Sequence, residues 1–196
     1  MRYSADITAG SLKIPESRAV ADLLIRGLSD EEFRRAIVEE NVLRSRNPRT
    51  SIRVARLVRQ RLAQMKPDLW RLVRDGSGNT STHAVFAAAV KHSPLLGDFL
   101  DFGVREQWRT FSPTLPKRLW EEYLHGCRER DPEMPQWNDS TRRKTGTVVY
   151  HMLQQAGYIE NTRSLKLLTV HVADPVVHYL MDNSEDYVLR CLQVTR

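Results

Sequence analysis

Cysteine is scarce in this sequence: Cys127 and Cys191 are the only two among 196 residues, and they lie far apart. Neither belongs to a C-x-x-C pair. A disulfide framework or a cysteine-ligated zinc site needs several cysteines at suitable spacings, so neither is expected here. Reduced thiols are typical of the cytoplasm, and we therefore expect a cytoplasmic protein.

Long apolar runs are also missing. No stretch of about 18 uninterrupted apolar residues occurs, although a helix that spans a bilayer needs one. Residues 1–10 lack the basic and apolar regions of a secretory signal. We therefore expect no membrane partner. With 41% hydrophobic and 28% charged residues, the composition is that of an ordered globular protein.

Motifs that carry catalysis or bind cofactors are absent as well. The sequence has no glycine-rich phosphate loop, no nucleophile elbow and no dinucleotide fingerprint. Its six histidines show no H-E-x-x-H motif or other paired metal spacing. Glu121 and Glu122 are adjacent, so on a helix they would point in different directions and make a poor acid-base pair. We expect no catalytic residues, no metal site and no cofactor, and hence a protein that is not an enzyme.

Positive charge is what the sequence has in excess. Thirty lysines and arginines against 24 acidic residues give a formal net charge of +6. A cationic surface attracts polyanions at long range, and its binding to phosphates releases condensed counterions. Charge alone leaves DNA, RNA and anionic lipid open as partners.

Helical periodicity dominates the first half of the chain. Ser29 and Glu32 form a capping-box pattern that predicts a helix start. The segment 50–65 carries an apolar stripe that we expect to pack inward. Its residues are Ile52, Ala55, Val58, Leu62 and Met65. The run 80–92 is apolar on nearly every side, which predicts a central buried helix. Another helix is expected over 95–109.

The second half predicts a different arrangement. After a proline-marked connector at 111–116, we expect one helix over 117–128 and another, capped by Ser140 or Thr141, that ends at Gly157. Two β-prone runs, 158–160 and 165–170, then flank a short polar turn and suit a hairpin.

The expected fold is therefore mainly α. A helical domain over 1–112 carries the basic helix, and a winged-helix-like domain with a short β-hairpin covers 113–196. In a winged helix the helix before the hairpin enters the DNA major groove, and the wing touches the neighbouring backbone.

The most informative local feature is the basic helix at residues 44–61. Its arginines recur at helical spacing, and the segment contains no acidic residue. The candidate phosphate contacts of this helix are Arg49, Arg53, Arg56 and Arg59. Clustered guanidinium groups need phosphate or distant carboxylates to neutralise them. The alternative is a solvated face paired with acidic residues of other segments. Those residues would be Asp30, Glu31, Glu39 or Glu40.

A second basic cluster belongs to the winged-helix-like unit. Cations and hydroxyl groups gather at the start of its second helix, and further cations lie at the expected hairpin. The candidate contacts are Thr141, Arg142, Arg143, Lys144, Thr145, Arg163 and Lys166. A helix N-terminus favours phosphate through its free N–H groups and its dipole. The alternative is that the unit only packs a core or binds another protein.

Four strings of the sequence resemble the BrxA family of bacterial BREX (bacteriophage exclusion) defence systems. They are the segments 3–10, 15–17, 37–43 and 55–59, which read YSADITAG, PES, IVEENVL and ARLVR. The resemblance implies a small non-enzymatic component encoded beside a methyltransferase, an ATPase and other defence proteins. It also implies a likeness to the RNA-binding antitermination protein NusB.

Three hypotheses follow. The first is an accessory protein that binds the backbone of double-stranded DNA with weak sequence preference, since phosphate contacts carry no base information. The second is an assembly subunit whose basic face meets another BREX protein. The third is an RNA-binding protein, as the NusB likeness implies.

Overall fold

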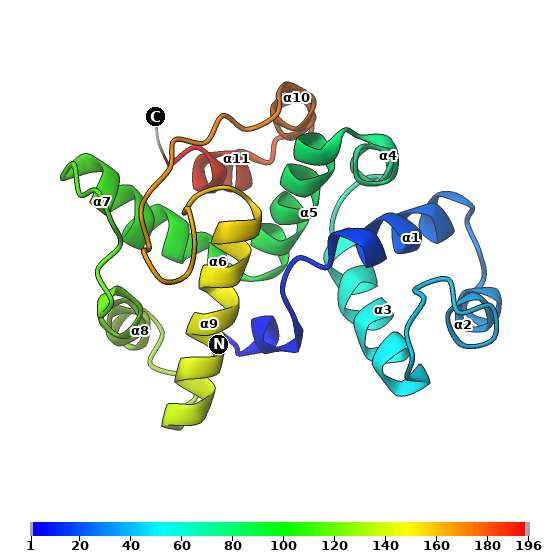
Figure 1. Ribbon diagram of the computed structural model, residues 1–196, viewed down its shortest axis with the longest axis horizontal. Helices are drawn as coiled ribbons and strands as arrows, with labels where there is room; N and C mark the ends of the chain where they lie inside the picture. Colours follow the sequence, from blue (N-terminus) through cyan, green and yellow to red (C-terminus); the bar gives the residue numbers. More distant parts are fainter. Residues whose placement is uncertain (1, 195–196) are drawn as a thin grey trace.

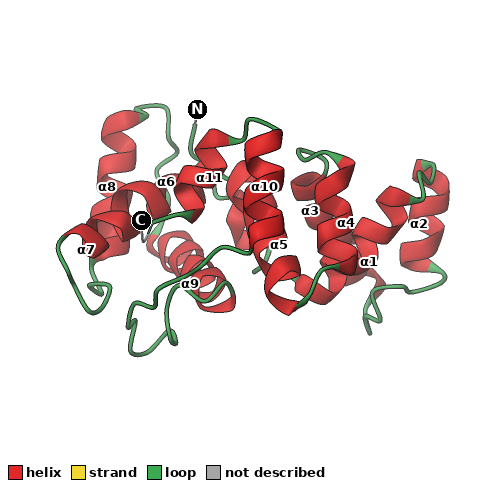
Figure 2. Ribbon diagram, turned by 90° about the horizontal axis from the view of Figure 1, so that it is seen from above, coloured by secondary structure: helices red, strands yellow, loops and turns green. Residues whose placement is uncertain are grey.

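The computed structural model describes residues 2–194, and within that range it is built from helices and connecting loops (Figures 1 and 2). In the N-terminal half these are η1 (Asp6–Ala9), α1 (Ile14–Ile25), α2 (Asp30–Val38), α3 (Pro48–Leu62), α4 (Pro67–Asp75) and α5 (Gly78–His92). They are followed by α6 (Pro94–Asp98), the π-helical η2 (Phe99–Val104), α7 (Arg105–Arg109), α8 (Leu119–Arg130), α9 (Asp139–Gln155), α10 (Asp174–Asp182) and α11 (Asp186–Leu192). None of the helices in this range is long and apolar enough to cross a bilayer.

Helix α5 lies at the centre of the molecule, as its sequence predicts. It contacts α1, α3 and α4 on one side and α6, α10 and α11 on the other, and Figures 1 and 2 show it between these two groups. Every residue from Ala84 to Val90 is buried. A helix that is apolar on every side buries its side chains only when neighbouring helices cover every face. This run therefore forms the centre around which the other helices pack.

The expected capping box at the start of α2 is confirmed. Ser29 accepts the backbone N–H of Glu32 on its Oγ at 3.3 Å, and the Glu32 carboxylate accepts the backbone N–H of Ser29 at 2.8 Å. Helix α3 begins at Pro48, after Asn47, whose side chain accepts the N–H of Arg49. Both helices begin where a side chain accepts the otherwise unpaired backbone N–H groups of the first turn.

The inward stripe expected over 50–65 is correct except at Ile52. Ala55, Val58, Leu62 and Met65 are buried, whereas Ile52 is 46% exposed. At about 100° per residue, Ile52 lies at the edge of the stripe, on the side of α3 that faces an open hollow beside α2. The prediction of an inward-facing Ile52 was therefore wrong.

The helix that ends at Gly157 is capped differently from the prediction. Asn138, rather than Ser140 or Thr141, is the N-cap of α9, and its Oδ1 accepts the N–H of Thr141 at 2.8 Å. Gly157 does end the helix, with a left-handed φ of +82° that favours glycine.

The regular hairpin expected over 158–170 does not form in the described chain. Residue Ile159 faces Leu167 in one isolated antiparallel bridge, and Lys166 makes a second bridge with Thr114. The φ of Leu165 is +51°, outside the extended region, so the backbone cannot continue as a strand there. These two bridges join three short antiparallel segments, around Thr114, Ile159 and Lys166.

The hydrophobic core continues across the expected domain boundary at 112/113. The ring of Phe99 lies 5.1 Å from the rings of Trp120 and Tyr123, centroid to centroid. Aromatic contacts of this kind contribute beyond simple burial. The two halves therefore share one core, and the division into two domains stays a prediction.

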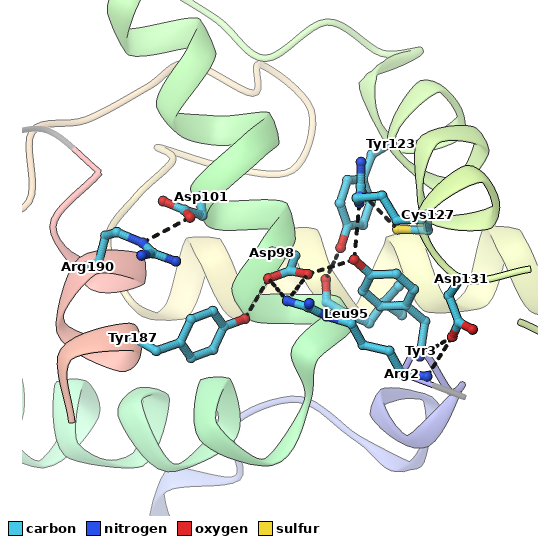
Figure 3. Close-up of polar contacts among 11 residues, drawn as sticks. Arg2, Tyr3, Leu95, Asp98, Asp101, Tyr123, Cys127, Asp131, Tyr187 and Arg190 are labelled. Atoms are coloured by element: carbon cyan, nitrogen blue, oxygen red, sulfur yellow. Dashed lines mark hydrogen bonds and ion pairs between the residues drawn. The ribbon is translucent and has the colours of Figure 1, made fainter. Parts of the chain in front are cut away.

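A buried polar cluster ties the N-terminal segment to the later helices (Figure 3). Asp98, which is 1% exposed, accepts hydrogen bonds at 2.7 Å from the hydroxyls of Tyr3 and Tyr187, and it pairs with Arg2 at 2.8 Å. Asp131 accepts the backbone N–H groups of Arg2 and Tyr3. A buried carboxylate is tolerated only with such partners, so the cluster joins the N-terminal segment to three segments that are distant in the sequence.

Acid should destabilise the fold through His83, which is buried in α5. Its Nδ1 accepts the N–H of Ala173 at 3.0 Å. Burial lowers the pKa of His83 below 6.5, and a hydrogen bond with the Ala156 backbone opposes that shift. The unfolded chain thus binds the proton at higher pH than the folded chain, and the free energy of unfolding should fall as the pH drops below about 6.5.

The variant His83→Asn tests this expectation, because its Oδ1 can replace Nδ1 as the acceptor but cannot take up a proton near neutral pH. In urea unfolding at pH 7.5 and pH 5, the loss of stability on acidification should be smaller in the variant. His151→Asn, at an exposed position of α9, serves as the control. An unchanged acid-side loss in His83→Asn would show that other groups cause it.

Candidate nucleic-acid interface

A close approach between α8 and α9 positions the cations of α9. A Cβ atom at Gly146 would lie 2.7 Å from Cδ1 of Trp120, so only glycine lets the two helices pack at this distance. The indole N–H of Trp120 also donates to the carbonyl oxygen of Arg142 at 2.9 Å. These contacts bury one face of α9 and leave the opposite face in solvent.

The cations at the start of α9 fall into two kinds. Arg143 and Lys144 are exposed, and their side chains form no ion pair with any residue from 2 to 194. Arg142 is half-buried and pairs with Asp139 and, at 3.5 Å, with Glu121. Since carboxylates already neutralise Arg142, the free positive charge of this turn belongs to Arg143 and Lys144.

The two threonines expected to offer hydroxyl groups differ in accessibility. Thr141 is half-buried at the first turn of α9. Thr145 is fully buried, and its hydroxyl donates back to the carbonyl oxygens of Thr141 and Arg142 at 2.9 and 2.8 Å. Thr145 therefore cannot reach a ligand in solvent, and its assignment as a contact is corrected.

The turn at 161–164 lies beside α9, and two further cations, Arg163 and Lys166, lie in it and just after it. Asn161 holds it by accepting the N–H groups of Arg163 and Ser164 on its Oδ1. The side chains of Arg163 and Lys166 are exposed and have no acidic partner within the described chain. Such side chains are free to meet an external anion.

A cavity of about 480 Å³ opens between α8, α9 and this turn, and Lys117, Arg143 and Thr162 contribute to its lining. Lys117 is not among the contacts predicted from the sequence. Its position after Pro116 and beside Arg118, just before α8, was the available signal.

Helix α3 presents the other predicted set. Arg49, Arg53 and Arg56 are exposed, and their guanidinium groups make no ion pair with the described residues. Arg59 instead pairs with Asp30 at 2.6 Å and lies over the ring of Phe33, 4.6 Å from its centroid. Of the four predicted arginines, only Arg59 is therefore neutralised by an acidic residue of another segment, as the alternative hypothesis expected.

A fifth arginine of α3 has a structural role. Arg61 is buried and donates to the carbonyl oxygens of Gly10 and Ser11 at 3.0 and 2.8 Å. Burial lowers its pKa to about 10. Arg61 fastens the loop after η1 to α3 and does not belong to the exposed basic face.

Helices α3 and α9 flank η1, which contacts both of them. Figure 1 shows their N-terminal ends at the same edge of the molecule, with η1 between them. The N-terminal ends of these two helices therefore lie at one edge, although the helices are far apart in the sequence.

Fold and surface together define a class: a helical protein with exposed cations on α3 and α9 that form no ion pair within residues 2–194. A family model described as BrxA matches residues 1–184. The chain belongs to the BrxA family.

Curated relatives support this assignment. The BREX protein BrxA of Paramagnetospirillum magneticum is 51% identical over 194 residues, which cover 99% of this chain and 98% of that protein. The BREX protein BrxA of Escherichia coli O9:H4 (strain HS) is 30% identical over 170 residues, covering 87% of this chain and 80% of that protein. A crystal structure of an uncharacterized protein from Magnetospirillum magneticum superposes with a TM-score of 0.92 at 50% identity, over 99% of this chain and all of that one.

Proposed function

We propose that this protein is a non-enzymatic component of a BREX phage-defence system that binds the backbone of double-stranded DNA. One observation carries the proposal: the exposed cations of α3 and α9 have no carboxylate partners among the described residues. These cations are Arg49, Arg53, Arg56, Arg143 and Lys144. The like charges within each cluster repel one another in the free protein, and a bound phosphate relieves this repulsion.

The order of elements around α9 supports a winged-helix-like use of this unit. Helix α8 is followed by α9, by residues 158–160, by the turn with Arg163, and by a segment that bridges back to Thr114. In this proposal the exposed face of α9 approaches a groove of the DNA, and Arg163 and Lys166 contact the neighbouring backbone, as the wing of a winged helix does.

Sequence preference should be weak. Base readout relies on side chains such as asparagine and glutamine, or on arginines aimed at base edges. The exposed face of α3 offers mainly arginines and a single glutamine, Gln60. We therefore expect phosphate contacts to supply most of the affinity.

Competition between nucleic acids tests the proposal against RNA binding. A labelled duplex DNA bound to the full chain should be displaced efficiently by unlabelled duplex DNA of unrelated sequence. Single-stranded and hairpin RNA of equal length should compete less well, because RNA recognition relies on unstacked bases and aromatic platforms. Preferential displacement by RNA would overturn the assignment to DNA, and the absence of any complex with DNA at low salt would overturn the proposed function.

A further inference from the structure

A second surface feature lies between α2 and α3, beside the unpaired cations of α3. These two helices leave an open groove of about 390 Å³ on their outer side. We name it the α2–α3 groove. Its floor is apolar and includes Phe33, Ile37, Val38 and Ala55. Ile52 lies in the same groove and is 46% exposed. A single exposed isoleucine is ordinary, but one continuous with an apolar hollow indicates a contact surface.

The rim of the groove is positively charged. Arg34 and Arg56 line it, are exposed, and form no ion pair with residues that the structure describes. Arg59 lies over Phe33 and pairs with Asp30, the one acidic residue among those that line the groove. Three guanidinium groups thus face a single carboxylate, and the rim keeps an excess of positive charge that a negatively charged partner would complement.

The spacing of the groove residues suits a helix. On α3, Ile52, Arg56, Arg59 and Ala63 follow one another at three- and four-residue steps, which extend over roughly 16 Å of helix axis. The small side chain of Ala63 allows a backbone to come close. A helix of about three turns can lie along this line, with its apolar side chains between α2 and α3.

We propose that the α2–α3 groove docks an amphipathic helix of another protein, with an apolar ridge flanked by aspartate or glutamate. An apolar floor contributes nothing to contact with a phosphate backbone, whereas it buries the ridge of a helix. The charged rim selects an acidic partner over a basic one. This inference does not depend on the proposed DNA binding, although Arg56 belongs to both surfaces.

A pair of synthetic helical peptides tests the proposal with the full-length chain. The acidic peptide carries leucines at i, i+4 and i+7 with glutamates beside them, and the basic peptide has lysine at every glutamate position. In fluorescence anisotropy, the acidic peptide should bind at least about tenfold more tightly than the basic peptide, since like charges across an interface disfavour association.

The substitution Ile52→Gln removes an apolar anchor and keeps every cation. It should weaken binding of the acidic peptide by about tenfold, the effect of losing a modest anchor, and leave affinity for duplex DNA unchanged. Met181→Gln, at an exposed methionine of α10, is the matched control and should change neither. Thermal melting checks that both variants are folded.

Three results would overturn the docking proposal: no binding of the acidic peptide, equal binding of the two peptides, or no effect of Ile52→Gln. If Ile52→Gln weakens the binding of duplex DNA as much as that of the acidic peptide, and DNA displaces the peptide from the wild-type protein, the groove belongs to nucleic acid instead. If DNA fails to bind while the peptide results hold, the proposed function is wrong and the groove stands.

Discussion

Replacing Asp98 by alanine should lower the free energy of unfolding by about 3–5 kcal/mol, the usual cost of breaking a buried charged network. The carboxylate holds the hydroxyls of Tyr3 and Tyr187 and the guanidinium of Arg2. Without it, the buried hydroxyl of Tyr3 and the half-buried hydroxyl of Tyr187 lose their partner, and each unsatisfied group costs further free energy. For a chain of this size, a change of this magnitude corresponds to a fall in melting temperature of roughly 10 °C.

Urea unfolding followed by circular dichroism measures this effect. Asp182→Ala is the matched control, because Asp182 is exposed at the end of α10 and its loss should change stability by less than about 0.5 kcal/mol. An Asp98→Ala variant as stable as the control would mean that the cluster in Figure 3 does not hold the N-terminal segment in place.

Removing both free cations from the start of α9 should weaken DNA binding strongly. Each phosphate contact contributes about 0.9 to the slope of log K against log salt, so Arg143→Ala with Lys144→Ala should reduce the slope by about 1.8. The same relation predicts roughly 30-fold weaker binding at 0.15 M salt, with the variant and the wild type converging toward 1 M salt. Anisotropy titrations with a labelled duplex measure both quantities.

The matched control removes the same amount of charge from other positions. Arg26 and Arg71 are exposed on α1 and α4, and each already pairs with a carboxylate, Asp22 or Asp68. Arg26→Ala with Arg71→Ala should leave the salt slope nearly unchanged. If both double variants lose affinity equally, net charge rather than the surface of α9 determines binding.

Much of the fold follows from local signals in the sequence. The capping box at Ser29, the all-apolar run in α5 and the stop at Gly157 act over a few residues, so periodicity and capping chemistry reveal them. The Asp98 cluster is different. Its members stand about 90 positions or more from Asp98 in the sequence, and no local pattern indicates that a carboxylate at position 98 will meet Tyr3 and Tyr187.

The candidate site shows the same limit. Clustered arginines mark α3 as basic from the sequence alone, and three of the four are exposed and unpaired. That Arg59 meets Asp30, or that Thr145 turns inward, depends on how α3 and α9 pack on their neighbours. Helical periodicity assigns residues to a face, but residues at the edge of a face, such as Ile52, are decided by tertiary contacts.

The most direct test of DNA-backbone binding is the salt dependence of the affinity of the wild-type protein for a duplex. If the unpaired cations of α3 and α9 contact phosphates together, log K should fall linearly with log salt, with a slope of about −4.5 or steeper for five or more contacts. A flat plot would contradict the account, because no set of phosphate contacts can bind DNA without releasing counterions.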